Sequence, residues 1–217
     1  MKALKLMAAL GLGALVGACG AMPDIASRNA PFEVTPTDAT SVAPAPTQVA
    51  QPVAPVAVDP TAALRVSAIN VTVPRSLRVS EANGYYPRAD IVWRGDPVGD
   101  RYQQVKAIFE TAFTAGTAAM AGPTDVTLDV ELQRFHSVTD KTRYSVGGVH
   151  NMVFYLTVRR SSTGEVLGNR RMVKADLPAL GGLAAVESDR IGQTQKVRVT
   201  DFLALTIQQE LRRFVSG

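Results

Sequence analysis

The chain has 217 residues, of which 46% are hydrophobic and 19% charged, with a net charge of +4 and one cysteine. A single cysteine excludes an internal disulfide framework and a cysteine-rich zinc site. The net charge is too low for a protein that coats nucleic acid, and the apolar content is too high for a chain that is disordered throughout. The length allows one domain of ordinary size with extensions.

The N-terminal segment, residues 1–18, is predicted to be a lipoprotein signal peptide. Two lysines and no acidic residue precede an uncharged run from Leu6 to Ala18. A basic start, a short apolar centre and a small-residue exit are typical of a secretory signal. The alternative is an anchor that stays in the membrane, but a helix needs about 20 apolar residues to span the bilayer and this run is shorter.

The exit from this run, Val16, Gly17, Ala18 and Cys19, resembles the lipobox of bacterial lipoproteins. The resemblance implies cleavage before Cys19 and acylation of its thiol and new amino terminus, which together form a stable anchor because several acyl chains hold a protein more firmly than one. Gly20 stands where an aspartate would resemble an inner-membrane retention signal. The absence of that aspartate favours the inner leaflet of the outer membrane, facing the periplasm, and the inner membrane is the alternative. The alternative for Cys19, a free reactive thiol, lacks a nearby histidine or basic residue.

Residues 19–62 are predicted to be the lipidated cysteine and a Pro- and Ala-rich disordered linker. Eight of the thirteen prolines fall between Ala21 and Ala62, where Arg28 is the only basic residue. Proline lacks an amide donor and biases the residue before it toward extended backbone, which excludes a helix. A partly polyproline-II linker of this length would reach about 130 Å when fully extended, far enough to hold a domain clear of the membrane.

Residues 63–217 are predicted to form one globular α+β periplasmic domain with 20 basic and 15 acidic side chains. Apolar alternation predicts strands over 64–73, 89–93, 126–133, 151–160 and 165–174. Helical periodicity predicts a helix that begins after the N-cap Asp100 and a second one over about 200–215. The order favours a mostly antiparallel sheet of about five strands with two helices packed on one face.

Three local expectations follow from the same reading. Residues 177–192 are expected to be a long loop, and residues 196–199 are either a short strand or the first turn of the last helix. The turn at 161–164 would set Arg160 opposite Glu165, a favourable cross-strand pair. The same register sets Arg171 opposite Phe154 on the core face, so Gly168 is expected to mark a bulge that resets the alternation.

The search for chemistry finds no nucleophile-elbow serine, zinc-protease, Walker or dinucleotide motif. His136 and His150 stand at predicted strand ends, where surface or packing roles are commoner than catalysis, and the two lack a third zinc ligand. Asp96 and Asp100 could do acid–base work or hold calcium, but turn and helix-cap roles account for both. We therefore predict a non-enzymatic domain with no catalytic residue, no metal and no cofactor. The enzyme alternative is a periplasmic hydrolase that uses Asp96, Asp100 or His136.

Basic side chains gather on the predicted hairpin, and we call this set the basic patch: Arg159, Arg160, Arg170, Arg171 and Lys174. The patch could contact an acidic partner or lipid head groups, and a solvated hairpin face is the alternative. Nucleic acid is not expected as a partner, because exported proteins do not normally meet it. Trp93 with Tyr85 and Tyr86 could line a ligand patch, although a core position for Trp93 is preferred.

The segment 89–97, the helix that follows it and the tract 195–199 resemble an uncharacterised family of Gram-negative lipoproteins, whose motifs carry no known chemistry. In architecture only, the domain is similar to the periplasmic auxiliary lipoproteins of lipid-transport ABC systems, and analogy of fold is a weak warrant for function. We expect a lipid-anchored envelope lipoprotein whose domain binds an envelope protein partner or acts in assembly. The alternatives are an auxiliary lipid-transport component that contacts anionic lipid, and a hydrolase.

Overall fold

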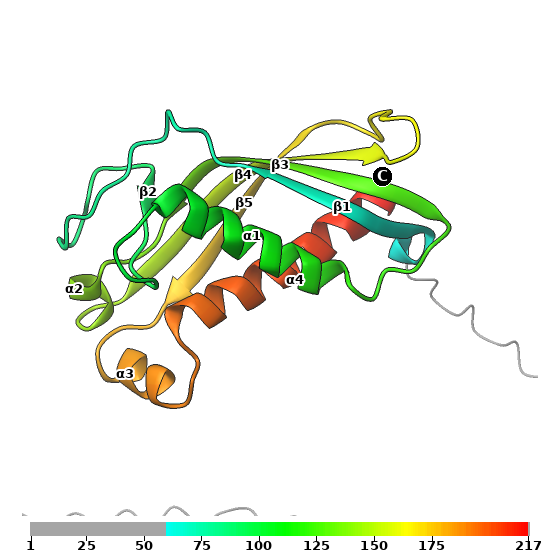
Figure 1. Cartoon of the computed structure of the whole chain (residues 1–217). Helices are drawn as coiled ribbons and strands as arrows, with labels where there is room; N and C mark the ends of the chain where they lie inside the picture. Colours follow the sequence, from blue (N-terminus) through cyan, green and yellow to red (C-terminus); the bar gives the residue numbers. More distant parts are fainter. Residues whose placement is uncertain (1–59, 217) are drawn as a thin grey trace, which may run out of the picture. The chain divides into compact units, whose positions relative to one another are not determined.

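The computed structural model describes residues 60–216 (Figure 1). The predicted signal peptide, Cys19 with its lipobox and the linker up to residue 59 lie outside the described residues, so these remain predictions. In chain order the elements are η1 (Pro60–Ala63), β1 (Leu64–Thr72), β2 (Ile91–Val92), α1 (Arg101–Thr117), β3 (Thr124–His136), α2 (Asp140–Arg143), β4 (Gly148–Arg160), β5 (Arg171–Ala179), α3 (Leu183–Arg190) and α4 (Gln195–Ser216).

The strands form one open five-stranded sheet in the order β1-β3-β4-β5, and β2 pairs with β3 beyond the end of β1. β1 and β2 run parallel to β3, whereas the longer β3–β4 and β4–β5 pairings are antiparallel and hold most of the paired residues. α1 connects β2 to its parallel neighbour β3, and α1 and α4 lie on the same face of the sheet (Figure 1). The predicted α+β architecture is therefore confirmed.

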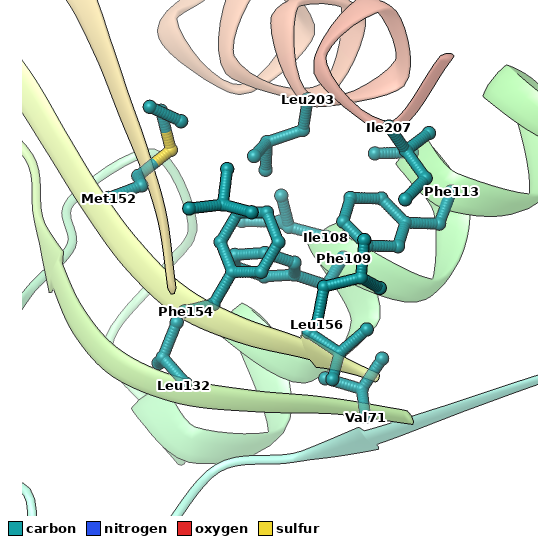
Figure 2. Close-up of a cluster of buried hydrophobic side chains, with 14 of the residues drawn as sticks. Val71, Ile108, Phe109, Phe113, Leu132, Met152, Phe154, Leu156, Leu203 and Ile207 are labelled. Carbon is teal, nitrogen blue, oxygen red and sulfur yellow. The ribbon is translucent and has the colours of Figure 1, made fainter. Parts of the chain in front are cut away.

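The core lies between the sheet and the two long helices. On β3, β4 and β5 alternate residues are buried, while their neighbours face the side of the sheet without long helices. Phe109 of α1 packs edge-to-face on Phe154 of β4, with ring centroids 5.2 Å apart, and on Phe113 at 5.5 Å. Figure 2 shows these rings meeting Leu203 and Ile207 of α4. Apolar burial of this kind is the main stabilising contribution to the domain.

α1 begins as predicted, because the Asp100 side chain accepts hydrogen bonds from the amides of Tyr102 and Gln103. The same helix carries a close approach to α4 at Gly116. A Cβ atom at Gly116 would lie 2.4 Å from the Ala204 carbonyl oxygen, so the two helices meet there backbone to backbone. The glycine therefore serves helix packing rather than ending the helix, which runs to Thr117.

The hairpin after β4 departs from the prediction in its register. Arg160 does lie opposite Glu165, with their side chains 3.4 Å apart. The strand predicted over 165–174 is misplaced, however, because β5 begins at Arg171. Val166 forms a β-bridge with Arg159, and Arg171 pairs with Leu156. Moving three residues along β4, from 159 to 156, therefore corresponds to moving five along the returning chain, from 166 to 171.

The two extra residues lie around Gly168, whose φ of 81° is a left-handed conformation that glycine adopts readily. An insertion of two residues preserves the alternation of faces, whereas one residue would reverse it. Arg171 therefore lies on the helix-covered face, opposite Leu156 rather than Phe154. Its guanidinium donates to Glu210 of α4 at 2.8 Å, which explains how a charged side chain is tolerated there.

The expected long loop over 177–192 is wrong, because β5 extends to Ala179 and α3 occupies Leu183–Arg190. The helix escapes periodicity analysis since only Ala185 and Ser188 are buried on it. The last helix starts at Gln195, so residues 196–199 are its first turn. The Thr194 hydroxyl accepts from the Val197 amide at 3.3 Å, a contact typical of a helix N-terminus.

Candidate functional site

The end of the domain opposite η1 gathers several chain segments, and we call it the far end. β1 leaves η1 and pairs with the start of β3, while the last residue of β3, His136, pairs with Asn151 near the start of β4. Gly148 pairs with Ala179 at the same end. Figure 1 shows α2, α3 and the first turns of α1 and α4 at this end, away from η1.

A group of polar side chains is buried at the far end, and we call it the far-end cluster: Ser137, Arg143, His150, Gln195 and Arg198. The first four are at most 5% exposed, and Arg198 is half-buried. The members come from the β3–α2 connection, α2, β4 and α4, so no short sequence motif contains them. Burial of polar groups is costly unless they are hydrogen-bonded, which makes this concentration informative.

A hydrogen-bond chain runs through the cluster. Gln195 Nε2 donates to Ser137 Oγ at 2.7 Å, and Ser137 Oγ lies 2.8 Å from His150 Nδ1. A serine hydroxyl can donate one hydrogen bond and accept two, so this contact fits either neutral tautomer of the His150 ring.

Charge at the cluster is dominated by two arginines. Burial, followed by the positive charges of Arg198 and Arg143, lowers the pKa of His150 to about 4, so the ring is neutral at neutral pH. Burial and then the charge of Arg143 also lower the pKa of Arg198. Arg143 donates to Asp189 of α3 at 2.6 Å, while Arg198 Nη2 donates to the Pro178 carbonyl at 3.2 Å.

The Ser137–His150 pair has the atoms of a nucleophile and a base but not their setting. Ser137 is 2% exposed and His150 is fully buried, so a carbonyl substrate has no approach to Oγ. The hydroxyl also accepts from the Gln195 amide, and the far nitrogen of the ring has no carboxylate to orient it. The arrangement therefore gives no support to acyl transfer.

Two hollows flank the cluster. One, of about 270 Å³, is lined by Tyr85, Tyr86, His136 and Ser137, together with the segment 146–149. The other, of about 360 Å³, is lined by Arg94, Arg143, Asp189, Gln195 and Lys196, among others. The first is largely apolar and aromatic, and the second is charged, so the far end offers two chemically distinct recesses.

Exposed apolar side chains line these hollows or lie on α3 and at its C-cap, and we call them the apolar rim. Eight of the twelve large hydrophobic residues that are exposed in residues 62–214 belong to it: Tyr85, Tyr86, Tyr144, Val146, Val149, Leu183, Val186 and Ile191. Tyr86 is 92% exposed and Leu183 is 88% exposed. A concentration of this kind marks an interaction surface more often than scattered apolar residues do.

The residues of the hydrolase alternative have separate structural contacts. Asp96 accepts from the Trp93 indole and from Lys196, each at 2.7 Å, and Asp100 caps α1 and pairs with Arg75. His136 Nε2 lies 2.9 Å from the Pro87 carbonyl oxygen. Among Asp96, Asp100 and His136, it is His136 that lines the aromatic hollow with Tyr85 and Tyr86. Trp93, which the sequence offered as a neighbour of these tyrosines, is fully buried. No group of three or more His, Cys, Asp or Glu residues within 60–216 has the geometry of a metal site.

The structure divides the basic patch between the two faces of the sheet. Arg159, Arg170 and Lys174 lie on the face without long helices, and Arg160 and Arg171 on the other. Four of the five are paired with acidic residues, at 2.6–3.4 Å: Arg159 with Asp129, Arg160 with Glu165, Arg170 with Glu131 and Arg171 with Glu210. Arg170 also stacks on Tyr155, 3.8 Å from the ring centroid. Much of the charge that the sequence gathers on the hairpin is thus balanced locally.

Sequence reasoning missed the far-end cluster, although one signal pointed to it. Met152, Phe154 and Leu156 alternate on the buried face of β4, and extending that alternation backward reaches His150. The arginines carried no such signal, because α2 has four residues and the first turn of α4 was left open.

Comparison with known proteins places the domain in a family. A family model described as a family of unknown function matches residues 64–216, well over half of the chain. The chain belongs to this family, DUF6778. The expectation of an uncharacterised family is confirmed, and none of the curated proteins compared with this DUF6778 member matches it.

Solved structures similar to this DUF6778 protein include three from Gram-negative bacteria. A Xanthomonas campestris protein of family DUF330 is 13% identical, with a TM-score of 0.38, over 72% of this chain and 86% of that one. A minor lipoprotein from Acinetobacter baumannii is 12% identical, with a TM-score of 0.32, over 67% and 92%. A protein from Caulobacter crescentus CB15 described as a candidate lipoprotein is 11% identical, with a TM-score of 0.33, over 73% and 94%. At these values the likeness assigns no activity or partner to this chain.

Proposed function

We propose that this protein is a lipid-anchored envelope lipoprotein whose non-enzymatic periplasmic domain binds an envelope protein partner through its far end. The proposed anchor is acylated Cys19 in the inner leaflet of the outer membrane. The observation that carries the binding proposal is the apolar rim, which holds most of the exposed large hydrophobic side chains of the described domain. None of the helices in 60–216 is long and apolar enough to cross a membrane.

The composition of the rim favours a protein partner. Tyr85, Tyr86 and Tyr144 supply aromatic side chains, the type enriched in the energetically dominant centres of protein interfaces. Part of the rim lines a recess of about 270 Å³, which could receive a side chain from the partner. Arginine and lysine side chains that line the neighbouring hollow would form a polar border.

The position of the rim suits a tethered domain. The linker joins the domain at η1, and the far end lies at the opposite end of the sheet (Figure 1). Tethering through η1 would leave the residues of the far end free to meet a partner. A linker of the predicted composition would allow the domain to search over distances on the order of 100 Å.

The test is position-dependent photo-crosslinking in intact cells. A photoreactive aromatic residue placed at Tyr86 or at Leu183, both strongly exposed, is expected to capture a discrete partner. The matched control is the same residue at Leu205, which is 56% exposed midway along α4. Equal capture from position 205 would contradict binding through the rim. Undiminished capture from position 183 in a Tyr86→Ser variant would contradict it as well.

The anchor has a separate test. Palmitate labelling of the wild-type chain is expected to disappear in a Cys19→Ala variant, because the thiol is the proposed acylation site. A Val16→Asp variant is expected to lose labelling too, since it alters the proposed lipobox while keeping the cysteine. Labelling that persists in Cys19→Ala would remove the lipid anchor from the proposal but leave the far-end test standing.

A further inference from the structure

Three buried side-chain atoms have no hydrogen-bond partner within residues 60–216, and all three belong to the far-end cluster. They are Arg143 Nη1, His150 Nε2 and Arg198 Nη1. Both arginine atoms are obligatory donors, and His150 Nε2 is a donor too in the tautomer in which Ser137 Oγ–H donates to His150 Nδ1. The cluster therefore has a surplus of buried donors and a deficit of acceptors, and each unmet donor carries a free-energy cost.

The three donors share one corner of the fold. Arg198 Nη2 donates to the Pro178 carbonyl, and Pro178 adjoins Leu177, the residue paired with His150 across β4 and β5. One turn earlier on α4, Gln195 reaches His150 through Ser137. Arg143 and Gln195 line the same hollow. The positive charge of Arg143 contributes, after burial, to lowering the pKa of both His150 and Arg198.

The positive charges in this corner are not all balanced by carboxylates. Arg143 has Asp189 as its acidic partner, at 2.6 Å through Nη2, but no carboxylate within 60–216 contacts Arg198. An arginine stays protonated even when buried, so a half-buried guanidinium without a counter-ion is unfavourable. A negatively charged acceptor would satisfy the surplus donors and the charge together.

We propose that the far-end cluster is a binding site for one small oxyanion, a carboxylate or a phosphate group, held by Arg143, Arg198 and the His150 Nε2–H. Guanidinium groups present parallel N–H donors that match carboxylate and phosphate oxygens. A charged hollow of about 360 Å³ lies beside Arg143 and Gln195, and Asp140 and Asp189 line it as well. Because His150 is fully buried, the part of the ligand that reaches it has to be small. This site does not depend on partner binding at the apolar rim.

The experiment measures thermal unfolding of the full acylated chain in a non-ionic detergent, using the fluorescence of Trp93, the only tryptophan. Inorganic phosphate and acetate are compared with chloride at equal ionic strength and pH 7. A ligand at one hundred times its Kd is expected to raise Tm by about 5–10 °C. Equilibrium dialysis with radiolabelled phosphate tests binding directly, and one phosphate per chain is expected.

The decisive variant is Arg198→Gln, which keeps a long polar side chain but removes the unpaired charge. Its affinity for phosphate is expected to fall at least tenfold. The control is Arg190→Gln, which neutralises an exposed arginine of α3 paired with Glu187, and its affinity is expected to equal that of the wild type. Binding that survives in Arg198→Gln would overturn the proposal.

The wild-type measurement decides the matter even if Arg198→Gln does not fold. Equal Tm in all three salts, with no labelled phosphate bound, would mean that the donors meet only water and would overturn the proposal. Vesicles of phosphatidylglycerol added to the dialysis then identify the source of the ligand. Release of bound phosphate by the vesicles assigns the site to a lipid headgroup, and retention assigns it to a free anion; both outcomes support the site.

Discussion

His150 makes the stability of the domain depend on pH in a way that a single substitution isolates. Its pKa is lowered from 6.5 to about 4, first by burial and then by Arg198 and Arg143. The folded domain therefore holds the ring neutral in a pH range where the unfolded chain protonates it. A folded pKa below the unfolded one means that stability is fully present above pH 6.5 and falls as the pH is lowered toward 4.

The magnitude follows from these two pKa values. Between pH 7 and pH 5 the unfolded chain takes up most of one proton at this position, while the folded domain takes up little. The linkage relation then gives a loss of about 2 kcal/mol in the free energy of unfolding. Asp189 of α3 and Lys196 of α4 also line the hollow at this corner, and they are present in both the wild type and the variant used below.

The assay is urea unfolding at pH 7 and pH 5, followed by the fluorescence of the fully buried Trp93. The buffers contain neither phosphate nor carboxylate, because a bound anion would favour the protonated ring. A His150→Gln variant cannot titrate, so its loss of stability over this interval is expected to be about 2 kcal/mol smaller than that of the wild type. Equal losses in the two proteins would refute a buried neutral His150.

Two further predictions concern the core between the sheet and the helices. Phe109→Ala, at the centre of the aromatic cluster, is expected to lower the free energy of unfolding by about 3–5 kcal/mol in the same urea assay; a change no larger than that of Val98→Ala, at an 82% exposed position, would contradict the packing. Gly116→Ala is expected to destabilise by about 1–3 kcal/mol, despite the higher helix propensity of alanine, because its Cβ would lie 2.4 Å from the Ala204 carbonyl oxygen. Gly84→Ala, where a Cβ meets nothing within 4 Å, is the matched control, and a Gly116→Ala variant as stable as it would show that α1 and α4 are not in backbone contact.

The sequence alone determined the elements whose signals are local. Asp100 marks the start of α1 because its side chain can reach two amides of the first turn. The alternation of Val126, Leu128, Val130 and Leu132 predicts β3, since a strand with one wet face repeats every two residues. The Arg160–Glu165 pair follows from the length of the turn between them. Such features need no knowledge of distant segments.

The start of β5 and the existence of α3 depend on tertiary contacts. β5 begins only after two bulged residues around Gly168. Its first residue, Arg171, then donates a hydrogen bond to Glu210 of α4, thirty-nine residues later in the chain. α3 buries too little surface to show helical periodicity. Both depend on contacts between segments that are far apart in sequence, which a single window cannot contain.

The far-end cluster is the clearest case of this division. The alternation along β4 places His150 on the buried face. Its pKa is lowered by burial first and then by Arg198 of α4 and Arg143 of α2, which keeps the ring neutral. Those arginines look like ordinary solvated residues in the sequence. Folding brings them to one corner because the end of the sheet, α2 and the start of α4 meet there, and burial then turns unpaired donors into a candidate site.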